Sequence, residues 1–229
     1  MSAIAGDMLD GDDPSGAAEL SAAPLASRII RATEYRRMAW KNGAGRSSEI
    51  LCMPNADADW LWRLSIAEVE VAAPFSCYPG VDRELVLLSG NGIRLQFDDG
   101  QVSELRPPYG GLRFPAERGL VGEPIDGPSR DFNVMWRRNS INACLWRRPL
   151  AGTMVLFPAK GETWVVHLLT GHGRFSADSS LGELMPGDTA VLRADGSGRS
   201  RHALAGTGEA LVVHLQELRH AQGPCPGPD

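Results

Sequence analysis

Short apolar segments separated by turns of Gly, Pro and Asp make up most of the chain after residue 28. In WLWRLSIAEVEV, which begins at Trp60, large apolar side chains alternate with residues such as Arg63 and Ser65, so the two kinds point to opposite faces of a strand. A repeat of about 3.6 residues, which an amphipathic helix needs, is scarce. The pattern therefore predicts an all-β protein, a sandwich or a barrel. Alternation alone leaves open whether Arg63 or Trp62 faces the interior.

Two tight turns are predicted between strands. Asn91 and Gly92 stand between two apolar runs, and both residue types adopt the positive φ of a type I′ turn. The segment ELVLLSGNGIRLQF is therefore expected to form a hairpin. Pro79 and Gly80 occupy the two central positions of an expected type II turn in YPGVDR.

The second half of the chain repeats the rhythm of the first. LLSGNG ends a predicted strand in the first half and LLTGHG ends one in the second, which indicates an internal duplication. Two double-sheet β-barrels, over residues 28–150 and 151–221, account for this repeat; a single sandwich of about a dozen strands is the alternative. Residues 1–27 lack aromatic side chains, and residues 222–229 contain three prolines. We predict a disordered tail at the first end and a loose one at the second.

The charge of the chain is concentrated at its beginning. Five acidic residues and no basic ones occur before residue 28, and they account for the whole net charge of -5. The remaining chain is formally neutral, so it lacks the basic stripe of a nucleic-acid-binding protein. No apolar run approaches the roughly 20 residues of a membrane-spanning helix, and the amino terminus does not resemble a signal peptide. We therefore expect a cytoplasmic protein that binds neither nucleic acid nor membrane.

The histidines and cysteines give no sign of a metal centre. All five histidines lie in the second half, and none stands two or four residues from another. His167 and His214 fall in apolar strands, where a histidine with satisfied hydrogen bonds is the expected case. The four cysteines show no C-x-x-C spacing. We expect neither a metal ion nor another cofactor, since a metal site needs three or four converging ligands.

The segment MAWKNGAGRSSEI, from Met38 to Ile50, is the first candidate for chemistry. The chain has 21 arginines and only two lysines, so Lys41 stands where a compact charge is wanted. Gly43 and Gly45 can bring successive N–H groups together into a nest for an anion. A glycine-rich loop with a solvated lysine is the alternative interpretation.

Polar residues on three later segments extend this set. Arg63 needs a partner if it faces inward, either a neighbouring acid in an ion pair or the carboxylate of a ligand. Ser65 shares its face, Asp82 and Arg83 follow the type II turn, and DFNVM places two further polar side chains on one side of a strand. The candidate ligand-binding residues are Lys41, Asn42, Gly43, Arg63, Ser65, Asp82, Arg83, Asp131 and Asn133.

Three blocks of the sequence closely resemble the HutD/Ves family, bacterial proteins tied to histidine utilisation. They are WKNGAGRSSEI, WRLSIAEVEVAAPFSCYPGVDRELVLLSGNGIRL and IDGPSRDFNVMWRR, which cover most of the first half, whereas the second half matches only in its cupin-like rhythm. The chain departs from the family pattern at Ala44, Ser47, Tyr78 and the FPAE segment from Phe114 to Glu117. The last departure removes a glycine turn from a loop at the barrel mouth.

The resemblance implies a bicupin, two double-stranded β-helix (jelly-roll) barrels in one chain. It also implies that the first barrel binds a small acidic intermediate of histidine breakdown, of the urocanate or N-formylglutamate type, and that the protein governs pathway flux or induction. No catalytic activity comes with the family. Besides the candidates above, the matching motif positions are Trp40, Glu49, Pro79, Gly80 and Phe132.

Two other functions are weighed against metabolite binding. The chain could be a cupin-type isomerase, hydrolase or dioxygenase acting on a small carboxylate, with Asp131 or Glu49 as general base; stoichiometric metal in the purified protein would favour it. It could instead be a scaffold whose second barrel binds a protein partner or a second copy of the chain. Binding without catalysis is the expected function.

Overall fold

The computed structural model describes residues 26–40, 43–54, 60–196 and 198–218. In these residues the chain forms sixteen strands and one short 3-10 helix, η1 (Ala32–Glu34). Every strand pair is antiparallel, and the strands form three sheets. The prediction of an all-β protein is confirmed. None of the helical structure in the described residues is long and apolar enough to cross a membrane.

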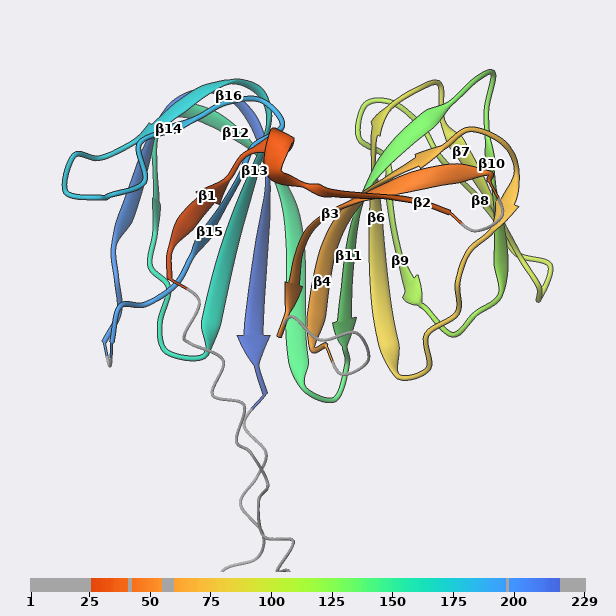
Figure 1. The fold of residues 1–229 in the computed structure, drawn as a ribbon, viewed down its shortest axis with the longest axis horizontal. Helices are drawn as coiled ribbons and strands as arrows, with labels where there is room; N and C mark the ends of the chain where they lie inside the picture. The colour runs from red at the N-terminus through yellow and green to blue at the C-terminus, as the bar shows by residue number, and fades with distance from the viewer. Residues whose placement is uncertain (1–25, 41–42, 55–59, 197, 219–229) are drawn as a thin grey trace, which may run out of the picture.

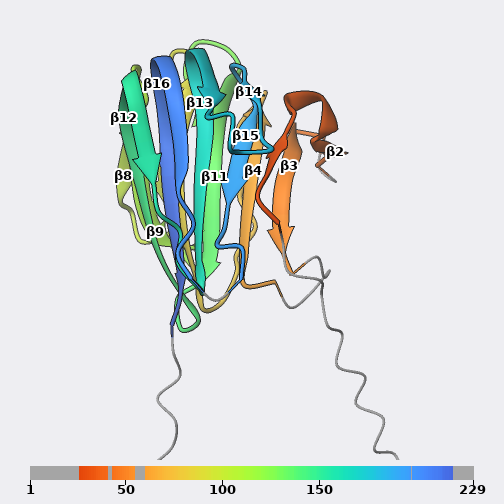
Figure 2. The ribbon, with the colours of Figure 1, turned by 90° about the vertical axis from the view of Figure 1, so that its left-hand side faces the viewer.

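The three sheets lie side by side as layers (Figure 1). The central sheet contains, in order, β2 (Arg36–Ala39), β3 (Gly45–Met53), β4 (Trp62–Val69), β11 (Ser129–Arg137), β6 (Val81–Ser89) and β9 (Gly111–Pro115). The outer sheet contains β5 (Ala73–Pro74), β10 (Leu120–Pro124), β7 (Ile93–Phe97) and β8 (Val102–Leu105). The C-terminal sheet contains β1 (Arg28–Ile30), β15 (Thr189–Leu192), β13 (Glu162–Phe175), β16 (His202–Glu217) and β12 (Ile141–Leu156), with β14 (Glu183–Leu184) paired to β13. Figure 2 shows β12, β16 and β13 side by side.

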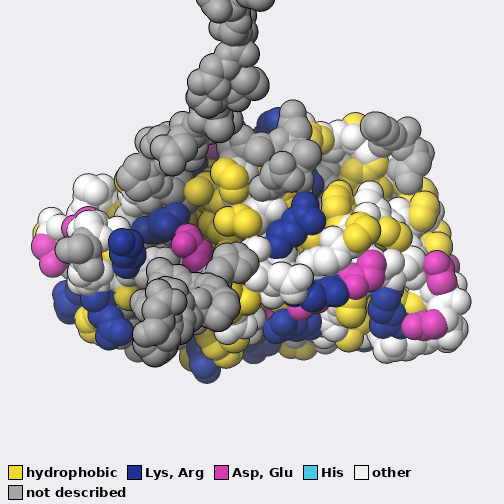
Figure 3. All heavy atoms as spheres, turned by 90° about the horizontal axis from the view of Figure 1, so that it is seen from below, with side chains coloured by type: hydrophobic (Ala, Val, Ile, Leu, Met, Phe, Trp, Pro, Cys, Tyr) yellow, Lys and Arg dark blue, Asp and Glu magenta, His cyan; other side chains and the backbone are white. Residues whose placement is uncertain are grey.

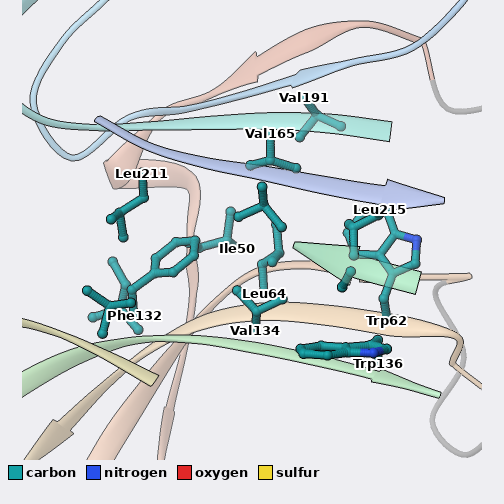
Figure 4. Packing of buried hydrophobic residues seen from close by; sticks show 14 of the residues in the cluster. Ile50, Trp62, Leu64, Phe132, Val134, Trp136, Val165, Val191, Leu211 and Leu215 are labelled. Atoms are coloured by element: carbon teal, nitrogen blue, oxygen red, sulfur yellow. The ribbon is translucent and has the colours of Figure 1, made fainter. Parts of the chain in front are cut away.

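Apolar cores lie on both faces of the central sheet. One core joins it to the C-terminal sheet, where Trp62, Leu64 and Val134 point towards Val165 and Leu215 (Figure 4). A second core fills the space between the central and outer sheets, and a third lies within the C-terminal sheet. Burying one such large apolar side chain contributes about 1.5–3 kcal/mol. Both faces of the central sheet are therefore held in place by packing.

This packing decides which face of β4 lies inside the first half. Trp62 and Leu64 belong to the core shared with the C-terminal sheet. Because successive side chains of a strand point to opposite faces, Arg63 and Ser65 point the other way, between the central and outer sheets. The alternation was read correctly in sequence, but both of its faces are buried, so polarity alone could not say which one lines the interior.

The two halves divide at different residues from those predicted. β1 belongs to the C-terminal sheet, where it pairs with β15, although residues 28–30 were assigned to the first half. Tyr35 then anchors the crossing, because its hydroxyl donates to the carbonyl of Gly187 at 2.5 Å. The predicted boundary at residue 150 lies inside β12, which pairs with β16 along its whole length. A boundary there would break a continuous ladder of hydrogen bonds.

One of the two predicted turns is confirmed and the other is wrong. Gly80 has φ +73°, and the N–H of Val81 donates to the carbonyl of Tyr78 at 3.3 Å, as a type II turn requires. The strands around Asn91 do not pair with each other, because β6 lies in the central sheet and β7 in the outer sheet. The connection turns a corner between sheets, and the positive φ falls on Gly90 and Gly92 rather than on Asn91.

The two predicted tails fall almost entirely outside the described residues. Residues 1–25 and 222–229 are not described. Ser27, at the end of the first tail, is held by the C-terminal sheet: its hydroxyl donates to the carbonyl of Arg193 at 3.1 Å and accepts that residue's N–H at 2.9 Å.

On the face seen in Figure 3, basic and acidic side chains are interspersed.

Candidate functional site

A cavity of about 710 Å³ opens between the inner face of the central sheet and the segment that leads from the outer sheet into β6. Strands β2, β3, β4, β11 and β6 each contribute side chains to its wall. The lining residues are Arg36, Met38, Ala39, Trp40, Ser47, Glu49, Cys52, Trp60, Arg63, Ser65, Ala67, Pro74, Phe75, Ser76, Tyr78, Arg83, Asn133 and Met135. Four of the candidate residues, Arg63, Ser65, Arg83 and Asn133, converge here.

The register of the central sheet arranges these side chains in three rows across the strands. Strands β3, β4, β11, β6 and β9 pair in this order, with one register shift on β3 between Glu49 and Leu51, so residues in one row come from neighbouring strands. The first row is Cys52, Arg63, Met135, Arg83 and Phe114. The second row is Glu49, Ser65, Asn133 and Leu85, and the third is Ser47, Ala67, Asp131 and Leu87.

Arg63 has an acidic partner within the protein. Its Nε lies 2.8 Å from Oε2 of Glu49, and Oε1 of Glu49 is 3.5 Å from Nε of Arg36. The short distance makes an ion pair, but the direction is not that of a hydrogen bond, so the buried Nε–H of Arg63 is left without an acceptor. Of the two partners predicted for Arg63, the neighbouring acid is the one observed.

Arg83 is buried without a carboxylate partner among the described residues. Its side chain is 5% exposed, and its Nη2 makes long contacts to Sδ of Met135 at 3.4 Å and to the carbonyl of Ser76 at 3.5 Å. Its Nε has no hydrogen-bond partner. Burial is the main cause of a lowered pKa at Arg83. The charge is therefore present in a dry environment that only partly satisfies it.

Aromatic rings surround the guanidinium group of Arg83. Its Cζ lies 5.5 Å from the ring centroid of Phe75, 5.8 Å from that of Tyr78 and 6.0 Å from that of Phe114. Rings at these distances attract a cation through their π faces, weakly compared with an anion. They also keep water away from the charge. The aromatic wall therefore stabilises a cation but does not neutralise it.

Asp131 is fully buried in the row below. Both of its carboxylate oxygens lack a hydrogen-bond partner within the described part of the chain. Burial raises the pKa of Asp131 to about 7, and the positive charge of Arg83 opposes this rise. Its direct neighbours across the strands, Ala67 and Leu87, are apolar. Near neutral pH this carboxyl group is therefore divided between its neutral and its charged form.

Asn133 lies between Arg83 and Asp131 on the inner face. It shares the middle row with Ser65, and its Oδ1 is buried without a partner among the described residues. The other wall of the cavity is aromatic: Nε1 of Trp40 donates to Oγ of Ser47 at 2.8 Å, and the ring of Trp40 meets that of Phe75 edge to face at 6.1 Å. The cavity thus combines unsatisfied polar atoms with apolar walls, which is typical of small-molecule sites.

The structure brings some of the predicted residues together and separates others. Arg63, Ser65, Arg83 and Asn133 line the cavity, and Asp131 lies behind its wall. Gly43 is exposed and is not among the lining residues; its φ is +70°, and its N–H donates to the carbonyl of Trp40 at 3.0 Å. A nest for an anion is not formed there by Gly43, because that donor closes a turn. Lys41 and Asn42 lie outside the described residues.

Asp82 belongs to the opposite face of the central sheet. Its carboxylate lies 3.3 Å from Nη2 of Arg113 and 3.0 Å from Nε of Arg138. Arg113 also lies over the ring of Trp136, which belongs to the core shared with the C-terminal sheet. Asp82 and Arg83 are adjacent in a strand and so point to opposite faces. The prediction that Asp82 contributes to the same site as Arg83 is therefore wrong.

A model of the HutD family matches residues 32–212. The chain belongs to the HutD family. An uncharacterised 21.2 kDa protein from the hutC 3′ region of Pseudomonas putida is 37% identical over 146 residues, which cover 60% of this chain and 76% of that protein. Protein Ves of Escherichia fergusonii is 35% identical over 136 residues, covering 58% of this chain and 67% of Ves.

The fold of this HutD-family chain is also seen in a solved structure. HutD from Pseudomonas fluorescens SBW25 superposes with a TM-score of 0.73 at 25% identity, covering 85% of this chain and 100% of that one. The similarity extends through both halves of the chain. The family resemblance found in the sequence is confirmed.

Sequence reasoning missed part of the wall of this HutD-family cavity. Trp60 and Tyr78, whose rings meet edge to face at 5.9 Å, both line it, as do Phe75 and Arg36. Tyr78 opens the type II turn, so that turn was a usable signal for its position. The alternation of β4 predicts that Trp60 lies on the same face as Trp62. This is wrong, because Trp60 lies before the start of β4, where the alternation no longer applies.

Two histidines in the second half of this HutD-family chain, His167 and His214, pack within the fold. Nδ1 of His167 is 2.9 Å from Oγ1 of Thr189, and burial lowers the pKa of His167 to about 4. The ring of His214 stacks on that of Trp164 at 4.4 Å. No group of three or more His, Cys, Asp or Glu side chains in the described residues is placed to hold a metal ion.

Proposed function

We propose that the cavity of this HutD-family chain binds a small acidic metabolite whose carboxylate lies beside Arg83. The observation that carries the proposal is the state of Arg83: it is almost fully buried, it lines the cavity, and it has no carboxylate within 4.0 Å among the described residues. An unpaired buried charge costs several kcal/mol in a folded protein. A ligand anion in the cavity would offset that cost.

The rest of the cavity suits such a ligand. Its volume of about 710 Å³ falls within the range of small-molecule sites. A hydrogen bond to a charged group contributes about 1.5–3 kcal/mol, so two or three of them support micromolar binding after the cost of ordering. Arg83 and Asn133 supply buried atoms that lack partners among the described residues. Lys41 and Asn42 stay predicted contributors.

The ligand class and the role follow from the family. Because the HutD family is linked to histidine utilisation, we propose an intermediate of the urocanate or N-formylglutamate type and a role in governing flux or induction of that pathway. Neither acid named for the enzyme alternative stands ready as a general base in the cavity. Glu49 is paired with Arg36 and Arg63, and Asp131 is not among the lining residues. Binding without catalysis is therefore the function that we propose.

A thermal-shift experiment tests this proposal. The purified protein is titrated with urocanate and N-formylglutamate. Histidine, whose carboxylate is balanced by its own ammonium group, serves as a comparison of zero net charge. We expect the acids to raise the melting temperature of the wild-type protein but not that of Arg83→Met, which keeps an unbranched side chain and removes the guanidinium charge. Arg106→Met is the matched control, because Arg106 is half exposed and pairs with Glu104 away from the cavity. An undiminished shift in Arg83→Met, or no shift in the wild type, contradicts the proposal.

A further inference from the structure

Four charged side chains occupy the buried inner face of the central sheet, one from each of four neighbouring strands. Glu49 of β3 and Arg63 of β4 neutralise each other at 2.8 Å. Asp131 of β11 and Arg83 of β6 remain. Arg36 of β2 adds a fifth charge at the rim, but its side chain is 65% exposed, so water screens it. The charge deep in the cavity therefore depends on the state of Asp131.

Asp131 and Arg83 are close enough to influence each other but do not form an ion pair. No contact of 4.0 Å or less joins them, and Asn133 occupies the row between them. The positive charge of Arg83 nevertheless acts on the carboxyl group of Asp131 and favours its ionised form. When Asp131 is ionised, the pair is neutral as a whole. When Asp131 is protonated, one positive charge is left uncompensated beside the cavity.

We propose that Asp131 takes up a proton when an anion binds beside Arg83, so that ionised Asp131 and the ligand are alternative counter-charges to one arginine. This inference deepens the proposed function and rests on it. The proton comes from solvent, the ligand keeps its charge, and no bond of the ligand changes. One ligand carboxylate replaces one protein carboxylate, so the buried charge is the same before and after binding.

The surroundings of Asp131 support this exchange. The residues beside it, Ala67 on β4 and Leu87 on β6, offer no hydrogen bond from their side chains that could hold the ionised form. Burial has already brought the pKa of Asp131 to about 7, so a modest further change in the local potential moves its proton. An anion near Arg83 is such a change, because it cancels the charge that favours ionisation.

The other charged and titratable groups near the pair act on Arg83 rather than on Asp131. Arg63 on β4 lowers the pKa of Arg83, whereas Cys77 and Tyr78, from the segment before β6, raise it. Arg63 is itself compensated by Glu49 on β3. Among these groups, Arg83 is the one whose charge acts on Asp131. The coupling between the ligand and the proton therefore runs through this arginine.

Proton uptake makes the affinity for an anion depend on pH. Above the pKa of Asp131, binding requires Asp131 to take up a proton from solvent, so the affinity falls by up to about tenfold for each pH unit. Below that pKa, Asp131 is already neutral and the affinity is constant. Asp131→Asn fixes the neutral state, so its affinity is expected to stay at the low-pH value throughout.

Isothermal titration calorimetry with N-formylglutamate tests the inference between about pH 6 and pH 8.5, where the carboxylates of this probe do not titrate. For wild-type protein we expect weaker binding at the higher pH, and a binding heat that differs between two buffers of unlike ionisation enthalpy. Asp131→Asn should lose both effects. Asp99→Asn is the matched control, since Asp99 is exposed at the turn between β7 and β8 and should behave as the wild type.

The outcomes separate this inference from the proposed function. Binding that weakens with pH in the wild type and stays constant in Asp131→Asn supports both. Binding with the same pH dependence in the wild type and in Asp131→Asn overturns the role of Asp131 and leaves the metabolite site standing. Absence of binding at every pH, in the wild type and in Asp131→Asn, overturns the proposed function and the inference with it.

Discussion

Arg63 and Arg83 flank the same residue, Met135, from the two sides of β11, yet they differ in their partners. Arg63 lies 2.8 Å from a carboxylate oxygen of Glu49. Arg83 has no carboxylate within ion-pair distance among the described residues and is the more deeply buried of the two. One arginine of this pair is part of the protein's own charge balance, and the other is the one that we propose to bind a ligand.

The two arginines should therefore differ in what their removal does to stability. Among the described residues, Arg63→Met leaves Glu49 with only the exposed Arg36 as a partner, and we expect it to lower the free energy of unfolding by about 1–2 kcal/mol. Arg83→Met removes an uncompensated buried charge, and we expect it to leave the free energy of unfolding unchanged or to raise it. Urea unfolding without ligand measures both. A larger loss for Arg83→Met than for Arg63→Met would contradict the assignment of roles.

Asp131 should make the free protein less stable as the pH rises. Its pKa of about 7 in the folded protein lies above the ordinary value of 3.8, so between these values the folded state holds a proton that the unfolded state has lost. The contribution of Asp131 to stability therefore falls between about pH 4 and pH 7, by up to about 4 kcal/mol. Asp131→Asn should remove this contribution, so its free energy of unfolding should rise with pH relative to that of the wild type, as measured by urea unfolding across that range. Equal slopes in variant and wild type would show that Asp131 titrates normally.

His167 should produce the opposite slope. Its pKa is about 4 in the folded protein, against an ordinary value of 6.5, so in this interval the unfolded state binds a proton that the folded state does not. Stability from this source rises between about pH 4 and pH 6.5. We expect His167→Gln to lose the rise, measured as the midpoint of thermal unfolding against pH. Because the slopes of His167 and Asp131 oppose each other, the wild-type profile should be flatter than that of either variant.

Two glycines with positive φ offer a test of the corner between the sheets. Gly90 has φ +97°, and a Cβ on it would come within 2.7 Å of the carbonyl oxygen of Pro128. Gly80 has φ +73° and nothing within 4 Å of such a Cβ. We expect Gly90→Ala to cost at least about 2 kcal/mol and Gly80→Ala about 1 kcal/mol, because only the first adds a clash to the strain. Chemical denaturation of the two variants measures the difference, and equal costs would argue against the tight corner.

The sequence was sufficient for the properties that depend on local pattern. Alternation in β4 placed Arg63 and Ser65 on one face, the Pro79–Gly80 pair gave the correct turn, and the apolar setting of His167 indicated a histidine held within the fold. These features depend on side-chain direction, backbone angles and burial, which neighbouring residues determine. The family motifs added the expectation that Arg63 and Ser65 belong to a ligand-binding site.

Properties that depend on packing between distant segments could not be predicted in this way. The alternation of β4 has two buried faces, because a second sheet covers the face that water would otherwise mark as outer. The hairpin at Asn91 failed because β6 and β7 each found partners in different sheets. The pairing of Arg63 with Glu49 follows from the register of β3 on β4, which contains an irregularity between Glu49 and Leu51.

The chain passes between the C-terminal and central sheets at both ends of their contact. Residues 31–35 lead from β1 to β2 at one end, and residues 138–140 lead from β11 to β12 at the other (Figure 1). A single connection would leave the two halves free to rotate about one point, whereas connections at opposite ends restrict that rotation. Strand β2, which carries Arg36 and Met38 at the cavity rim, follows directly after the connection formed by residues 31–35. A ligand at this rim would therefore contact a strand that leads directly into one of the two connections between the halves.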